Sequence, residues 1–157
     1  MEPDPDTICA IYEKTSLGAP RNAVGFVLWR VMHRYQRAAE RALAPHGLTH
    51  LQFTTLAMVG WICRSGEAAT QAEVSRQADI HPMQISLMLK ALEGKGMVSR
   101  RPSATDTRTR MVSITTRGLQ ALQDAFPTIV ELQHRMFGKA GAPGGALLDA
   151  LHKIDGE

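Results

Sequence analysis

Residues 70–96 read TQAEVSRQADIHPMQISLMLKALEGKG. Thr70 and Glu73 have the spacing of a capping box, which predicts that a short helix begins here. Pro82 predicts the start of a second helix, because proline lacks only a backbone N–H that the first helical position leaves unpaired. The inner face of this second helix is predicted by apolar residues at helical spacing: Ile85, Met88, Leu89 and Leu92. Since only residues 79–81 separate the two segments, the stretch predicts a helix-turn-helix motif.

The segment after this motif has the pattern of a two-stranded hairpin. Two glycines end the second helix, and residues 97–101 and 110–115 then read as strands. Between them, residues 102–109 are polar and rich in turn formers. Helix, short turn, helix and hairpin follow one another in the order of a winged helix-turn-helix. We expect this DNA-binding lobe to cover residues 48–115.

The sequence on both sides of the lobe predicts further helices. An amphipathic pattern covers residues 24–43, and Thr49 with Gln52 forms another capping box that begins a helix within the lobe. A long helix follows the hairpin, and we expect Pro127 to kink it. A glycine-rich break at residues 138–145 precedes a short terminal helix.

Together these elements predict a mostly α-helical chain of α+β class that forms a single domain over residues 1–157. Residues 1–21 read as an arm with one short helix near residues 7–14. Residues 22–47 and 116–157 carry more apolar positions than a winged helix alone covers, and two-fold symmetry is the usual way to bury such faces. We therefore expect these two flanking regions to form a helical dimerisation region.

Basic residues are concentrated around the predicted hairpin. The whole chain has a net charge of +3, whereas the segment from Lys90 to Arg110 alone holds six basic and two acidic residues. A basic segment on a nearly neutral body indicates a polyanionic partner. The alternative is a solvated charged loop with no partner.

Cysteine usage and hydropathy indicate the compartment. Cys9 and Cys63 do not make a disulfide framework. The acidic start lacks the apolar core of a signal peptide, and no apolar run is long enough to span a bilayer. We expect a cytoplasmic protein with no membrane partner.

The second helix of the motif supplies the candidates for major-groove contact, because its first turns must present short or polar side chains to the base edges. Gln84 is the best candidate reader, since its amide can pair with adenine through two hydrogen bonds. Met83 and Leu87 are candidates for contact with thymine methyl groups, and the alternative is that they pack inward. The candidate set on this helix is Pro82, Met83, Gln84, Ser86, Leu87 and Lys90.

The hairpin supplies a second group of candidate DNA contacts. Arg108 lies in the loop between the strands, where an arginine on a narrow finger suits a narrow, negative minor groove. Asp106 is expected to hold the loop by hydrogen bonds, and the alternative is an exposed turn with a weak local ion pair. Arg101 and Arg110, at the ends of the strands, complete the set.

In this order and spacing, four pieces of the sequence resemble the MarR family of bacterial regulators. They are Leu48-Thr-His-Leu-Gln-Phe53, Leu92-Glu-Gly-Lys-Gly96-Met-Val-Ser-Arg100, Asp106-Thr-Arg108 and Ile114-Thr-Thr-Arg-Gly118. The resemblance implies a homodimer with interlocking terminal helices, a wing arginine (here Arg108) in the minor groove, and a small molecule or oxidant that switches DNA affinity. One departure is Leu87, which stands where many members carry a polar or basic groove residue.

The resulting hypothesis is a regulator, most simply a repressor, that binds a pseudo-palindromic double-stranded operator as a homodimer. The other hypothesis is a winged-helix module that binds an acidic protein partner. The polar start of the second motif helix favours DNA, because an interaction module would present a broader apolar patch. We expect no enzyme activity and no cofactor.

A small aromatic effector is the expected ligand, because a pocket needs apolar walls with a few polar anchors. Its candidate lining is Trp29, His33, His50 and Phe53, and the alternative is that these are plain interface and core residues. We expect no metal site: His46 and His50 are four residues apart, but they straddle a break at Pro45 and Gly47.

Overall fold

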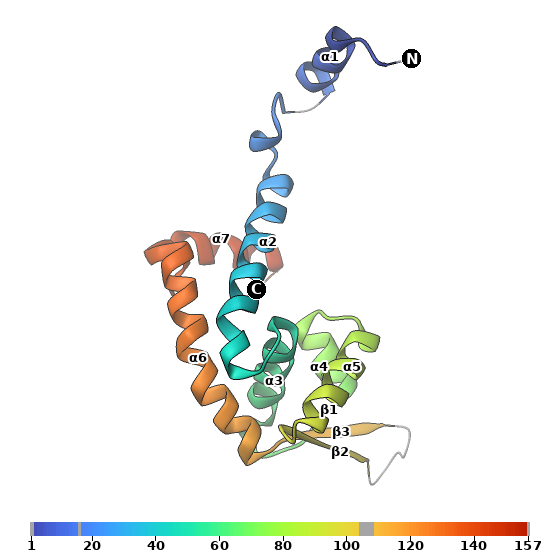
Figure 1. Ribbon diagram of the computed structural model, residues 1–157, viewed down its shortest axis with the longest axis vertical. Coiled ribbons are helices and arrows are strands. Elements are labelled where there is room, and N and C mark those ends of the chain that lie inside the picture. The colour runs from blue at the N-terminus through green and yellow to red at the C-terminus, as the bar shows by residue number, and fades with distance from the viewer. Residues whose placement is uncertain (1, 16, 104–108, 157) are drawn as a thin grey trace. The chain divides into compact units, whose positions relative to one another are not determined.

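The computed structural model describes residues 2–15, 17–103 and 109–156 (Figure 1). The chain divides into two compact units, residues 1–38 and 39–157. Within the described residues, no helix combines the length and the apolar character that crossing a membrane requires.

The first unit is helical. Helix α1 (Pro5–Thr15) confirms the short helix predicted in the arm, and it begins where the Asp4 carboxylate accepts hydrogen bonds from the Thr7 backbone N–H and hydroxyl at 3.3 and 3.2 Å. Helix α2 (Val24–Leu43) has the predicted bounds, and its last turn belongs to the second unit. Gly47, in the left-handed region at φ 67°, follows the short 3-10 turn that ends α2.

The second unit holds the remaining helices. Helix α3 (His50–Ile62) begins at the predicted capping box, in which Gln52 N–H donates to the Thr49 hydroxyl at 3.1 Å and Thr49 N–H donates to the Gln52 side chain at 3.4 Å. Helix α4 (Gln71–Ala78) and helix α5 (Pro82–Gly94) form the predicted helix-turn-helix. Helix α6 (Thr116–Phe137) continues through Pro127, and a glycine-rich turn separates it from α7 (Ala146–Asp155).

A three-stranded antiparallel sheet lies beside these helices. Its strands are β1 (Ala69–Thr70), β2 (Val98–Pro102) and β3 (Arg110–Ile114), in the spatial order β1-β3-β2. The predicted hairpin is β2 with β3, and its register pairs Val98 with Ile114 and Pro102 with Arg110. Strand β1 was not predicted from the sequence, because two residues are too few for strand periodicity to be visible.

The hydrophobic core of the second unit packs the helices of the DNA-binding lobe against its sheet. Fully buried side chains come from α3, α5 and β3: Leu56, Val59, Ile85, Leu89, Leu92 and Val112. Burial of each Leu or Ile contributes roughly 1.5–3 kcal/mol to stability. Phe53 of α3 packs edge-on against Phe126 of α6, with ring centroids 5.4 Å apart. The fold is therefore mostly α-helical with a small sheet, and it is a winged helix in which α5 is anchored along its whole inner face.

Candidate nucleic-acid interface

The turn between α4 and α5 is built by local hydrogen bonds. Asp79 ends α4 in the left-handed conformation at φ 49°. Ile80 N–H donates to the Ser75 carbonyl at 3.1 Å, and the buried Ser75 hydroxyl donates to the Ile80 carbonyl at 2.6 Å. These two bonds hold the short turn in one conformation and so fix the direction in which α5 leaves α4.

The starts of the two motif helices follow the sequence prediction with one difference. At α4, the Thr70 hydroxyl accepts from Glu73 N–H at 3.1 Å, as a capping box requires. The Glu73 carboxylate accepts from the Gln77 amide at 3.3 Å, so its described bond does not return to Thr70. At α5, the His81 ring accepts from Met83 N–H at 3.2 Å, which makes this histidine the helix cap.

Helix α5 has one face in the core and one in solvent. Ile85, Leu89 and Leu92 are fully buried as predicted, and Met88 is half-buried. The exposed fractions of Met83 and Leu87 are 69% and 57%, so the alternative that these side chains pack inward is wrong. Pro82, Gln84 and Lys90 are also exposed, and Ser86 is half-buried. The exposed face therefore mixes amide, ammonium and apolar groups.

The strand ends place basic side chains beside this helix. Arg101 of β2 and Arg110 of β3 are exposed and lie at adjacent positions of the ladder, since Arg101 pairs with Met111 and Pro102 with Arg110. The remaining two candidates of the wing, Asp106 and Arg108, lie outside the described residues.

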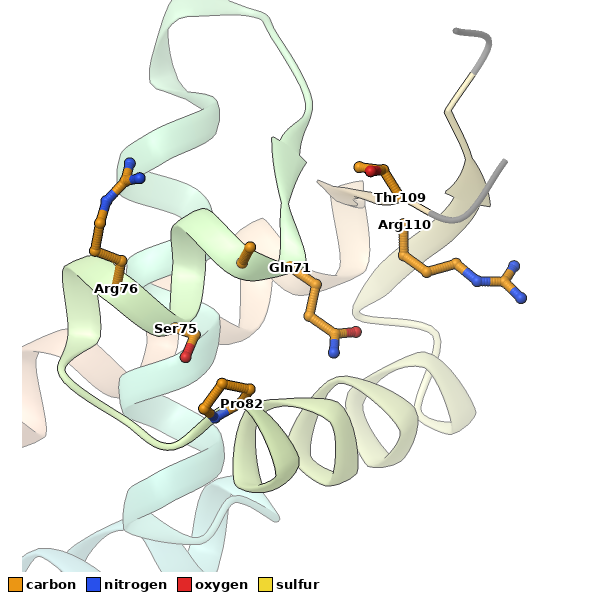
Figure 2. Close-up of a pocket in the computed structure, with 7 residues that line it drawn as sticks. Gln71, Ser75, Arg76, Pro82, Thr109 and Arg110 are labelled. Atoms are coloured by element: carbon orange, nitrogen blue, oxygen red, sulfur yellow. The ribbon is translucent and has the colours of Figure 1, made fainter. Parts of the chain in front are cut away.

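Two adjoining hollows separate the motif helices from the strands. The first, of about 480 Å³, is lined by Gln71, Ala72, Ser75, Arg76, Pro82, Thr109 and Arg110. Figure 2 shows its residues on the two helices, with Arg110 on β3 at its edge. The second, of about 410 Å³, is lined by Gln71, Ser86, Glu93, Arg100 and Arg110. Because Gln71 and Arg110 belong to both hollows, we treat them as one surface, the helix–strand trough.

Among the trough residues that sequence reasoning missed as candidates are Gln71, Arg76 and Arg100, whose side chains can donate hydrogen bonds to DNA. Gln71 is the first residue of α4, directly after the Thr70 cap, and this position is the only sequence signal that marks it. Arg100 was counted in the basic segment and in one of the pieces that carry the family resemblance, but not as a candidate DNA contact. What brings it to the trough is the pairing of β2 with β3, which the sequence does not specify residue by residue.

An ion pair fixes one arginine of the trough. The Arg100 guanidinium donates to one oxygen of the Glu93 carboxylate at 2.9 and 2.6 Å, linking α5 to β2. The hydrogen bond from Arg100 lowers the pKa of Glu93, and the charge of Arg100 and, more weakly, of Arg110 acts in the same direction. Glu93 is therefore charged at neutral pH and offsets Arg100. Arg76 and Arg110 are exposed cations that line the trough, and Lys90 of α5 and Arg101 of β2 are exposed as well.

The four candidate ligand residues fall into two pairs. In the first unit, the rings of Trp29 and His33 lie 4.2 Å apart, and His33 Nδ1 is 2.8 Å from the Trp29 carbonyl oxygen. In the second unit, His50 N–H donates to the Glu40 carboxylate at 2.8 Å, and Phe53 is buried against Phe126. Burial lowers the pKa of His50, and the Glu40 charge partly opposes this shift.

His46 and Cys63, which were considered from the sequence, each have a partner distant in the chain. His46 Nε2 lies 3.1 Å from the Thr128 hydroxyl. Cys63 is half-buried, with its thiol donating to the Val112 carbonyl at 3.6 Å, and Cys9 is exposed. Among the residues that the structure describes, no group of three His, Cys, Asp or Glu side chains has the arrangement of a metal site.

The described geometry is that of a winged helix-turn-helix DNA-binding protein: an anchored second helix with an exposed polar face, flanked by basic strand ends. A family model described as the MarR family matches residues 48–109. The match agrees with the resemblance found in the sequence: this part of the chain is similar to the MarR family of DNA-binding transcriptional regulators.

Known proteins similar to this chain carry corresponding descriptions. The HTH-type transcriptional regulator YdcH of Bacillus subtilis is 29% identical over 126 residues, 80% of this chain and 86% of YdcH. The HTH-type transcriptional repressor Rv2887 of Mycobacterium tuberculosis is 28% identical over 120 residues, 76% of this chain and 84% of its own. The solved structure of CouR from Rhodococcus jostii RHA1, bound to p-coumaroyl-CoA, has 27% identity and a TM-score of 0.72 and covers 87% of this chain and 94% of CouR. YdcH and Rv2887 are both described as transcriptional regulators.

Proposed function

We propose that this chain is a cytoplasmic repressor that binds a pseudo-palindromic double-stranded operator as a homodimer. The observation that carries the proposal is the division of α5: its apolar face is locked in the core, and its other face is exposed beside the basic ends of β2 and β3. An α-helix of this kind fits the width of the major groove. Repression is supported by the name of Rv2887 and by simple occlusion, since a protein bound over a promoter blocks polymerase.

The proposed contacts divide by the part of the duplex that they meet. Side chains on the exposed face of α5 meet base edges, and the basic strand ends meet phosphates on either side of the trough. Arg108 enters the minor groove, and Asp106 steadies the loop that carries it. The full set is Pro82, Met83, Gln84, Ser86, Leu87, Lys90, Arg101, Asp106, Arg108 and Arg110.

Exposed apolar side chains on the flanking helices support the homodimer. On α6, Leu119, Phe126 and Val130 are 43–50% exposed, and on α7 Ile154 is 74% exposed. Between α6 and α7 lies an apolar hollow of about 170 Å³, lined mainly by Phe137, Leu147, Leu148 and Leu151. A second copy would bury such surfaces, because an isologous interface uses the same patch on both subunits. Residues 22–47 and 116–157 would then be the dimerisation region and residues 48–115 the DNA-binding lobe.

The test is binding to duplexes taken from the DNA that flanks the gene, measured by fluorescence anisotropy across a salt series with a random duplex as control. We expect at least 1,000-fold tighter binding to one flanking duplex, about the low end for specific regulators. Sedimentation should give two chains per duplex. Equal, steeply salt-dependent binding to all duplexes would mean that the protein binds DNA only through non-specific charge. The hypothesis of an acidic protein partner would then be favoured.

We extend the proposal to a small aromatic effector that releases the operator. Support comes from the structure of CouR bound to p-coumaroyl-CoA. Aromatic carboxylates and their coenzyme A thioesters should be titrated into the preformed operator complex, with aliphatic carboxylic acids as controls. Trp29→Ala and His50→Gln variants should shift the midpoint of release. If no compound and no oxidant changes operator affinity, the effector is excluded.

A further inference from the structure

The exposed face of α5 carries an apolar strip made by Met83 and Leu87. These residues are one helical turn apart, so their side chains are neighbours on the helix surface. Each lies about 200° around the helix from a fully buried residue, Ile85 or Leu89, given roughly 100° per residue. Their exposure, 69% and 57%, therefore follows from the position of α5 in the core and not from a loosely held side chain.

The side chains around this apolar strip indicate which kind of partner surface it fits. Gln84 and Lys90 are exposed on the same side of α5, and Arg110 stands across the helix–strand trough. An apolar strip framed by cations and an amide is complementary to a surface that is negative at its edges and has apolar groups between them. The major groove of duplex DNA has this chemistry, with phosphates along both rims and base edges on its floor.

On that floor, one group is apolar: the methyl group at position 5 of thymine. The thioether of Met83 has three rotatable bonds and a polarisable sulfur, so it adapts to the position of a methyl group. Leu87 offers a branched apolar end at the next turn of the helix. Leu87 has no hydrogen-bonding group, and the thioether sulfur of Met83 is only a weak acceptor, so apolar contact is the main interaction that either side chain offers to a base edge.

We propose that Met83 and Leu87 determine operator specificity by contacting pyrimidine 5-methyl groups, those of thymine, at two positions in each half-site. The inference rests on the proposed function and deepens it, because it names the base feature that the exposed face of α5 selects. It also gives a physical role to Leu87, which stands where the family resemblance leads one to expect a polar or basic groove residue.

The size of the effect follows from the area of a methyl group. Burial of one such group changes affinity by about threefold to fourfold. A dimer with two contacts in each half-site covers four methyl groups, so replacing all four thymines by uracil should weaken binding by roughly 100-fold. Uracil keeps every hydrogen-bonding group of thymine, and the substitution therefore isolates the methyl contact.

The experiment begins with selection of an operator from random duplexes by the full-length protein. Each thymine of that operator is then replaced in turn by uracil, and the dissociation constant is measured by anisotropy. We expect two positions per half-site at which uracil weakens binding of the wild-type protein. In Met83→Gln the thymine-to-uracil ratio should fall to about one at one of these positions, and in Leu87→Gln at the other.

Lys90→Gln is the matched control on the same helix. It should weaken binding to thymine and uracil operators by the same factor, because an ammonium group does not sense the methyl group. Thermal melting of all three variants should match the wild type, since the substituted side chains are exposed.

A further set of duplexes distinguishes the 5-methyl group of thymine from that of 5-methylcytosine. At each sensitive position, cytosine and 5-methylcytosine replace thymine, with the paired base changed to guanine. We expect 5-methylcytosine to bind tighter than cytosine and weaker than thymine. Tighter binding to 5-methylcytosine than to thymine would overturn the assignment to thymine.

Two results distinguish this inference from the proposed function. A selected operator that binds equally well with uracil throughout, or a thymine-to-uracil ratio unchanged in both variants, would overturn the methyl contact and leave specific DNA binding intact. Failure to select any operator would overturn the proposed function itself.

Discussion

Helices α5 and α7 each carry a row of apolar side chains on one face, but only the row on the inner face of α5 is fully buried by its own chain. In α5, Ile85, Leu89 and Leu92 are fully buried. In α7, all of whose residues the structure describes, none is buried, and Leu147 and Leu151 retain 37% and 39% of their exposure. A similar row of apolar residues is thus buried within the chain in α5 and left exposed in α7. Variants in the DNA-binding lobe and in the flanking helices should therefore separate operator affinity, stability and dimerisation.

The largest effect is expected for operator affinity in Arg108→Ala. A dimer loses two minor-groove contacts, and at about 1–3 kcal/mol each the loss is roughly 2–6 kcal/mol, about thirtyfold to over ten-thousandfold in affinity. Asp106→Ala should give a smaller loss. Arg117→Ala, at the start of α6, is the control and should matter less. Unchanged affinity of an intact Arg108→Ala dimer would favour the protein-interaction module.

The covered face of α5 should dominate stability. Leu89→Ala leaves a cavity among fully buried neighbours and should lower the free energy of unfolding by about 2–5 kcal/mol. Urea denaturation followed by circular dichroism measures this loss. Leu87→Ala, two residues away on the exposed face, is the matched control and should change stability by less than about 0.5 kcal/mol. Equal losses in both variants would mean that α5 has no inner face.

The exposed face of α7 should affect assembly and spare the fold of the chain. Leu151→Ser removes an apolar contact from each copy and should weaken dimerisation by about 1–3 kcal/mol, as a shift in the sedimentation profile at micromolar concentration. His152→Ser, its exposed neighbour, should leave the profile unchanged. A monomeric wild-type protein would contradict the dimer and the palindromic operator together.

The ion pair between α5 and β2 should have a small effect with a defined pH window. Because the folded-state pKa of Glu93 lies below its ordinary value of 4.5, its contribution is fully present above pH 4.5 and is lost as pH falls through the lowered pKa. Exposed pairs contribute about 0.2–1 kcal/mol, and we expect the low end for Glu93→Gln. Melting temperatures of both proteins should converge at acidic pH, and a constant difference at all pH values would assign the effect to packing.

His50 should make the free energy of unfolding depend on pH in a second range, at higher pH than that of Glu93. Its folded-state pKa is lowered by burial, so the unfolded chain binds more protons near the ordinary value of 6.5. The free energy of unfolding should therefore fall as pH drops below 6.5 toward the lowered pKa. His50→Gln should flatten this slope in denaturation curves, whereas His152→Gln should not.

Local signals in the sequence determined where most helices begin and end. Thr49 with Gln52, and His81 with Pro82, form their caps within four residues of chain, so the responsible atoms are already close together before folding. The same holds for the three-residue turn of the helix-turn-helix, for which Asp79 adopts a left-handed conformation. From these signals and the basic segment, the order of elements and the DNA-binding class could be predicted.

Only the tertiary structure decided what distant segments do to one another. Strand β1 exists because Ala69 pairs with Val112, and Arg100 is fixed because strand pairing brings it to Glu93. The direction of Met83 and Leu87 was open in the sequence, because an apolar side chain suits either a core or a groove. Packing of Ile85 and Leu89 against α3 and the sheet settled it. Such contacts depend on long-range geometry, and no short window of sequence contains both partners.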